Sequence, residues 1–123
     1  MYDKDLLLEV LMQTADAAKR VIQRFEPVHS AAYFTDTPEG MEKLDAICMV
    51  LIAIGESLKN IDKITGKKLL LRYPEVDWKG AKGLRDIVSH HYFDVDAEEI
   101  FWVCENKMKP LASTIEKIIN DIR

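Results

Sequence analysis

Three long stretches of the chain repeat apolar residues every three or four positions, the spacing that places them on one face of an α-helix. The pattern predicts helices over residues 5–25, 38–63 and 97–122. No stretch alternates apolar and polar residues as a half-buried strand would, and the chain contains no internal repeat. The sequence therefore predicts an all-α fold.

Local sequence signals mark where the predicted helices begin and bend. Pro38 suits the first position of the second helix, because its missing N–H has no partner there anyway. Pro110 lies inside the last helix and should bend it near Asn106, whose carbonyl the proline ring would meet. Residues that favour the N-cap position precede the helices: Asp3 or Asp5, Thr37, Asp77 and Asp96.

The middle of the chain is less regular. We interpret residues 27–37 as an ordered connection packed by its aromatic residues, and residues 67–73 as a short helix before Pro74. A further main helix should begin at Trp78 and continue to Tyr92. The prediction is an antiparallel bundle of four main helices plus a short one, forming a single domain over residues 1–123.

Two residues interrupt the apolar stripe of the second helix. Gly55 costs about 1 kcal/mol relative to alanine inside a helix, so we expect a neighbouring helix to approach its backbone closely. Glu56 follows it on an otherwise apolar stretch, where a solvated carboxylate is favoured over a functional one. Cys48 and Cys104 lie within apolar patterns without metal-ligand spacing, which indicates buried, reduced thiols.

Charge is distributed unevenly along the chain. The net charge of −4 argues against nucleic-acid binding by overall attraction. Residues 59–85, however, contain eight basic and three acidic residues. Such a strip suits a phosphate-bearing ligand, although lysines that only solvate helix faces would explain it equally well. The N-terminus lacks the order of a signal peptide and no apolar run could cross a bilayer, so we expect a cytoplasmic protein.

The densest group of reactive side chains is the segment RDIVSHHY at residues 85–92. On an ideal helix Arg85 and His90 are separated by about 140° and about 7.5 Å of rise, so they do not share a face. Either the helix ends near Ser89 and His90 curls back, or two chains each contribute one residue. Asp86 is four residues before His90 and can hydrogen-bond to it, which would favour the charged imidazole.

Arginine and histidine without a metal constellation suit RNA cleavage by internal attack. In that reaction the 2′-hydroxyl of the substrate is the nucleophile, histidine exchanges protons near neutral pH, and arginine stabilises charge on phosphate. A structural role for Arg85 and His90 near a helix end is the more frequent alternative for these residue types alone. The residues themselves leave both interpretations open.

The spacing Arg85-x4-His90-x-Tyr92 resembles the motif of the HEPN superfamily in the form found in HepT-like proteins. The similarity extends to Ile54-Gly55-Glu56, to Pro74 and Trp78, and to the block that leads into the last helix, so it covers nearly the whole chain. The resemblance implies a helical bundle that dimerises with its motifs facing across a composite cleft.

The resemblance also implies a function, which is that of a metal-independent endoribonuclease toxin in a type VII toxin–antitoxin pair. Its partner would be a small, MntA-like nucleotidyltransferase antitoxin that adds AMP to Tyr92. Arg85 would hold the scissile phosphate, His90 would act as the acid–base group, and Asp86 would assist. No cofactor, metal or membrane is implied. Lys79 and Lys82, which belong to the basic strip, are expected to bind the RNA.

Two alternatives belong to other classes of protein. The chain could be a non-catalytic helical dimer that docks and supports a nucleotidyltransferase, which its overall acidity mildly favours. The pair could also modify another target, with this chain supplying the substrate-binding half. The basic strip that ends at Arg85 favours the ribonuclease over both.

Overall fold

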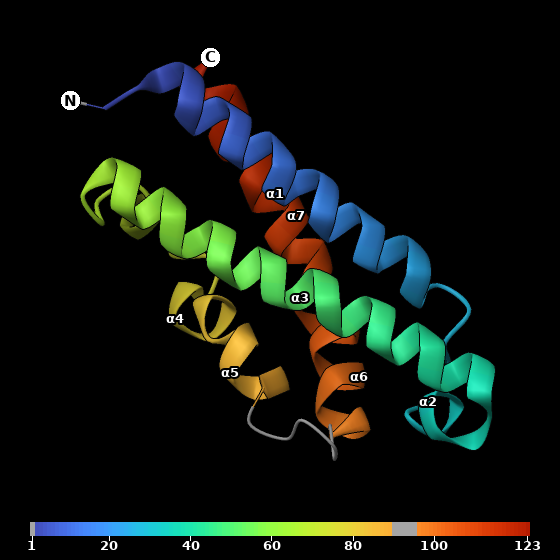
Figure 1. Ribbon diagram of the computed structural model, residues 1–123. Coiled ribbons are helices and arrows are strands. Elements are labelled where there is room, and N and C mark those ends of the chain that lie inside the picture. The colour runs from blue at the N-terminus through green and yellow to red at the C-terminus, as the bar shows by residue number, and fades with distance from the viewer. Residues whose placement is uncertain (1, 90–95) are drawn as a thin grey trace.

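The computed structural model describes residues 2–89 and 96–123, and this part of the chain contains helices but no strand, which confirms the all-α prediction (Figure 1). The elements, in chain order, are α1 (Lys4–Phe25), α2 (Ala32–Asp36), α3 (Pro38–Thr65), the 3₁₀ turn η1 (Leu70–Arg72), α4 (Trp78–Lys82), α5 (Leu84–Ser89), α6 (Ala97–Asn106) and α7 (Met108–Ile122).

Helices α1, α3 and α7 form the framework of the molecule. Helix α1 packs antiparallel to α7 and antiparallel to α3, while α4 and α5 lie on the other side of α3 from α1 (Figure 1). The hydroxyls of Thr14 on α1 and Ser57 on α3 hydrogen-bond at 2.5 Å, and Lys19 pairs with Glu116 of α7. The apolar stripes of the three helices meet in the interior, where the predicted faces are buried.

The helix boundaries follow the predicted capping residues. The N-cap side chains each accept a hydrogen bond from a backbone N–H of the following turn, at Asp3, Thr37, Asp77 and Asp96. The last predicted helix is divided into α6 and α7 at Lys107. This confirms the disturbance predicted near Asn106, because Pro110 has no N–H to offer the Asn106 carbonyl.

Three segments differ from the sequence predictions. The connection over residues 27–37 contains a short helix, α2, and the short helix predicted over residues 67–73 is only the 3₁₀ turn η1. The helix predicted to run from Trp78 is interrupted at Gly83, which separates α4 from α5. Gly80 and Gly83 lie three residues apart, and each glycine weakens a helix, so a continuous helix is disfavoured there.

Both cysteines are buried and unpaired, as predicted. Burial raises the pKa of the Cys48 thiol to about 11 and that of Cys104 to about 12. Neither thiol is therefore a thiolate near neutral pH, which makes both unsuited to nucleophilic chemistry. No helix in the described part of the chain is long and apolar enough to cross a membrane.

Gly55 is the point where the α4–α5 segment rests on α3. A Cβ atom at this position would lie 3.3 Å from the carbonyl oxygen of Lys82 and 3.5 Å from the backbone nitrogen of Arg85. The close approach predicted from this glycine is thus confirmed, and it is made by backbone rather than by side chains. Glycine therefore sets the distance between α3 and the start of α5, where Arg85 is located.

Candidate functional site

Arg85 lies in the first turn of α5 and points toward α3. Its Nη1 donates a hydrogen bond of 2.9 Å to Oε1 of Glu56, and the Nζ of Lys59 lies 3.9 Å from the other oxygen of that carboxylate. The side chains of Arg85 and Glu56 are 55% and 43% exposed. A pair this exposed contributes at most about 1 kcal/mol to folding, so its main effect is to orient the guanidinium.

Glu56 is the residue that the sequence interpretation undervalued. It is half-exposed, but it is ion-paired to the arginine of the candidate motif and is not simply solvated. The two residues are 29 positions apart in sequence, so helical periodicity could not have revealed their contact. The usable signal was the adjacent Gly55, because a close approach of a second segment also brings that segment within reach of Glu56.

His90 and Tyr92 lie outside the described residues. The placement of His90 relative to Arg85, its hydrogen bond to Asp86, and the role of Tyr92 therefore stay predictions. Asp86 is described: it is exposed on α5 and faces the groove defined below.

An open groove of about 600 Å³ lies between the C-terminal half of α3 and the α4–α5 segment. We call it the lysine groove, because five of its eight lining residues are lysines. The lining residues are Lys59, Asp62, Lys63, Lys67, Lys79, Lys82, Gly83 and Asp86. The fold thus brings Lys79 and Lys82 together with lysines from α3 that are close to them only in space, and it places them beside Arg85.

The lysines of this groove differ in how they are neutralised. The Nζ of Lys82 lies 2.6 Å from Oδ2 of Asp62, a buried carboxylate, so Lys82 is held against α3. Lys59 is near Glu56. In the part of the chain that the structure describes, Lys63, Lys67 and Lys79 make no ion pair and are exposed.

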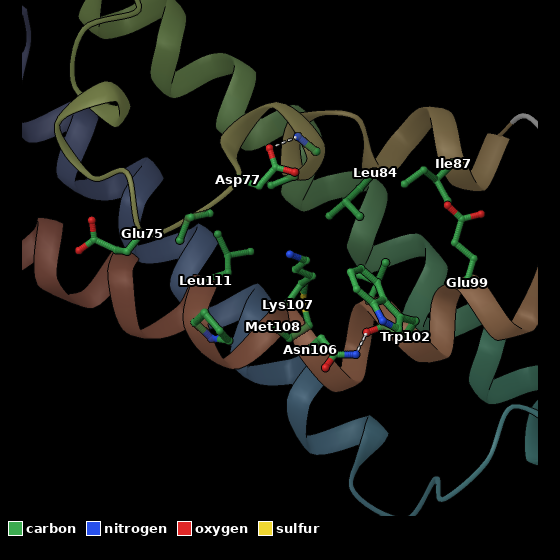
Figure 2. A pocket seen from close by; sticks show the side chains of 15 residues that line it. Glu75, Asp77, Leu84, Ile87, Glu99, Trp102, Asn106, Lys107, Met108 and Leu111 are labelled. Atoms are coloured by element: carbon green, nitrogen blue, oxygen red, sulfur yellow. Dashed lines mark hydrogen bonds between the residues drawn. The ribbon is translucent and has the colours of Figure 1, made fainter.

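The opposite face of α4–α5 borders a cavity of about 280 Å³ against α6 and α7. Figure 2 shows Leu84 and Ile87 reaching toward it from α5, with Trp102 and Lys107 on the other side. Lys107 also lies over the Trp102 ring, 5.1 Å from its centre. The cavity lies where α6 gives way to α7, and apolar side chains provide much of its lining.

The described side chains suit the binding of phosphate. Arginine offers a planar, permanently charged fork and lysines offer mobile positive charge, both of which favour phosphate oxygens. Within residues 2–89 and 96–123, no group of three or more His, Cys, Asp or Glu is placed to hold a metal ion. The fold and this surface define an all-helical protein with a lysine- and arginine-bearing face whose chemistry suits phosphate.

Comparison with known proteins gives the family. A family model described as ribonuclease HepT-like matches residues 15–118, so the chain belongs to the HepT-like ribonuclease family. Two relatives from Methanocaldococcus jannaschii, named Putative RNase MJ0127 and Putative RNase MJ1216, are 39% and 34% identical to it over 77 residues. Each match covers 63% of this chain and 60% of the relative, which is less than two thirds of the relative's length. No solved structure matches the chain significantly.

Proposed function

We propose that this chain is a metal-independent endoribonuclease that acts as the toxin of a toxin–antitoxin pair, in a single HEPN-like domain. The observation that carries the proposal is the placement of Arg85. Its guanidinium is exposed, oriented by Glu56 and located beside the lysine groove, in a chain of the ribonuclease HepT-like family. RNA phosphates attracted to the lysines would reach a fixed arginine.

The proposed reaction needs no group beyond side chains and the RNA itself. The 2′-oxygen attacks the adjacent phosphorus while the bond from phosphorus to the 5′-oxygen breaks, which leaves a 2′,3′-cyclic phosphate and a 5′-hydroxyl. His90 takes up the proton of the 2′-hydroxyl and returns a proton to the departing 5′-oxygen. Arg85 stabilises the negative charge that grows on the phosphate oxygens, and Asp86 supports the charged form of His90.

We further propose that the site is completed by a second copy of the chain. Arg85 and His90 are five residues apart, so one straight helix would direct them about 140° away from each other. A two-fold dimer solves this problem, because the arginine of one chain can meet the histidine of the other across a shared cleft. The exposed side of α5 is the surface that such a pairing would use.

The catalytic proposal is tested by incubating the purified chain with RNA in EDTA, next to Arg85→Ala and His90→Ala variants. We expect cleavage by the parent and a loss of at least about 100-fold in each variant, as for the removal of one charge-stabilising group. The products should carry cyclic phosphate ends. A parent that leaves RNA intact under all conditions, or variants as active as the parent, would contradict the proposal.

The composite site has its own test. Arg85→Ala and His90→Ala chains are mixed so that subunits exchange before the cleavage assay. If each site takes one residue from each chain, half of the sites in a mixed dimer regain both residues and activity returns. If each chain carries a complete site, the mixture stays inactive, and the composite arrangement is wrong even though the ribonuclease proposal stands.

The antitoxin in this proposal is an MntA-like nucleotidyltransferase that modifies Tyr92. The tyrosine oxygen would attack the α-phosphorus of ATP and release pyrophosphate, which leaves AMP on the hydroxyl. An added phosphate and adenine beside the cleft would exclude RNA by bulk and by like charge. The test mixes the chain with the product of a neighbouring nucleotidyltransferase gene and ATP, and seeks an added AMP by mass spectrometry. Modification that persists in Tyr92→Phe would contradict the assignment.

The acidic net charge favours a second candidate, a non-catalytic dimer that supports a nucleotidyltransferase. This alternative predicts a tight complex with the nucleotidyltransferase and no RNA cleavage in EDTA. The proposed ribonuclease predicts cleavage that stops after AMP addition. The same preparation, assayed for cleavage before and after treatment with the partner and ATP, separates the two functions.

A further inference from the structure

We propose that the lysine groove is a binding site for the sugar–phosphate backbone of an RNA strand, which it leads to Arg85. The inference extends the proposed function, on which it rests, by assigning a substrate path to residues of α3. It also ranks the groove lysines by their contribution, with Lys63, Lys67 and Lys79 as the main phosphate contacts.

The groove has two facing rows of positive charge. Lys59 and Lys63 are four residues apart on one stripe of α3, and Lys67 follows just beyond the end of that helix; all three line the groove. Lys79 and Lys82 are three residues apart on α4, on the opposite wall. The rows come from segments separated in sequence, and the contact of α4 with Gly55 brings them together.

The ranking of the lysines follows from their partners. Lys82 is neutralised by Asp62, which is buried and keeps the amine within 2.6 Å, so its charge is largely committed to the fold. Lys59 shares the carboxylate of Glu56 with Arg85. Lys63, Lys67 and Lys79 have no acidic partner among the described residues, so their charge is available to a ligand.

Lys67 provides a second, independent indication. Its φ is +63°, directly after Gly66 at +65°, and its N–H donates to the Asp62 carbonyl at 2.8 Å as part of the C-terminal cap of α3. Glycine or asparagine would adopt this left-handed conformation with less strain than lysine. A strained residue that also carries an uncommitted charge toward a groove indicates that the charge has a use there.

The composition of the groove favours phosphate over protein as the ligand. The cores of protein–protein interfaces are rich in aromatic residues and poor in lysine, whereas the described residues that line this groove include five lysines and no aromatic residue. The described lining therefore offers charge for phosphates and no aromatic ring on which a base could stack. It therefore suits the backbone of RNA, read by charge and without sequence preference.

The test measures binding of a fluorescent, single-stranded 2′-O-methyl RNA, which lacks the attacking hydroxyl and cannot be cleaved by that route. The double variant Lys63→Ala/Lys67→Gly is compared with Lys4→Ala/Lys109→Ala, which removes the same charge from exposed positions on α1 and α7. Losing two phosphate contacts should lower the slope of log affinity against log salt by about 1.4 and weaken binding about 25-fold at 0.1 M salt. The control pair should change neither quantity by more than about twofold.

Folding is controlled through Lys67→Gly alone. Because glycine relieves the left-handed strain, this variant should melt at a temperature no lower than that of the parent. Its slope of log affinity against log salt should nevertheless fall by about 0.7, the contribution of one phosphate contact. Binding that falls equally in the groove and control pairs would show only overall attraction and would overturn the proposal. Unchanged RNA binding in the Lys63→Ala/Lys67→Gly variant would also overturn it. The proposal would fail as well if an acidic protein competed with the RNA while Lys67→Gly bound RNA normally.

The outcomes for the groove and for catalysis are separable. If Arg85→Ala abolishes cleavage but the groove variants bind and cleave as the parent does, the ribonuclease stands and the lysine path is wrong. If the parent binds the probe through the groove but cleaves no RNA, the path stands and the ribonuclease proposal fails.

Discussion

The two faces of the α4–α5 segment have opposite chemistry. Toward α6 and α7 the segment presents apolar residues such as Ala81, Leu84 and Ile87 at helical spacing, which border the cavity of Figure 2. Toward the end of α3 it presents Lys79, Lys82 and Asp86, which line the lysine groove. The two sets of positions interleave along the sequence, so one short segment provides both a packing face and a charged face.

The difference shows how a marginal element can carry a site. Helices of five and six residues are too short to be stable alone in water, so α4 and α5 depend on tertiary packing. The apolar face supplies that packing. The packing in turn fixes where the charged residues of the opposite face lie. Contacts on the apolar side should therefore govern stability, whereas contacts on the charged side should govern RNA binding and cleavage.

The largest expected effect is on the apolar face. Leu84 is 3% exposed, and Leu84→Ala should lower the free energy of unfolding by about 2–5 kcal/mol, because it removes buried methyl groups and leaves a cavity. Asp86→Ala, two residues along on the charged face, should change it by no more than about 0.5 kcal/mol. Denaturant unfolding of both variants checks this. Similar losses in both would abolish the distinction between the faces.

The next effect is at the contact between α3 and α4–α5. Gly55→Val would force side-chain atoms against the Lys82 carbonyl and should destabilise the fold by about 1–3 kcal/mol. It should also reduce RNA cleavage further than its stability loss explains, since Arg85 moves away from Glu56. The control is Ala53→Val, an exposed position on the same helix, which should retain activity. Full cleavage by a folded Gly55→Val chain would show that this spacing is not required.

Glu56 tests the charged face without disturbing the apolar one. Glu56→Gln keeps the shape but weakens the hold on Arg85, and we expect about tenfold slower cleavage, equivalent to about 1.4 kcal/mol of activation free energy. Stability should fall by less than about 1 kcal/mol, because the pair is exposed. Glu105→Gln, at an exposed position on α6, is the matched control.

A double-mutant cycle then shows whether Glu56 acts through Arg85. If it does, Glu56→Gln should have little further effect in an Arg85→Lys background, where the guanidinium that Glu56 orients is already lost. Strictly additive effects on cleavage would instead place Glu56 in a separate role.

The contrast between the faces also explains what the sequence could predict. The three long helices follow from apolar periodicity, and their ends follow from local capping residues such as Thr37 and Asp96, because both signals depend on near neighbours in the chain. The interruption at Gly83 was not predicted, since two glycines in a short helix only weaken it and packing decides the outcome.

The candidate site was predicted only in part, for a related reason. The spacing of Arg85, His90 and Tyr92 is a local pattern and indicated the motif, and the local charge balance indicated a basic strip. The pairing of Arg85 with Glu56 depends on how α5 is placed over α3. The same holds for the neutralisation of Lys82 by Asp62, which no charge count along the chain can reveal.

The smallest predicted effect has the opposite sign to the others and concerns Asp62. Asp62→Asn removes the carboxylate that neutralises Lys82, so one more lysine becomes available to RNA in the groove. Affinity for the uncleavable RNA should therefore rise about fivefold at 0.1 M salt, and its salt slope should steepen by about 0.7. The double variant Asp62→Asn/Lys82→Ala should leave affinity nearly unchanged, because it removes a pair of opposite charges. A loss of affinity in this double variant as large as that in Lys79→Ala would mean that the ion pair opens when RNA binds, and the division of the lysines into committed and available ones would fail.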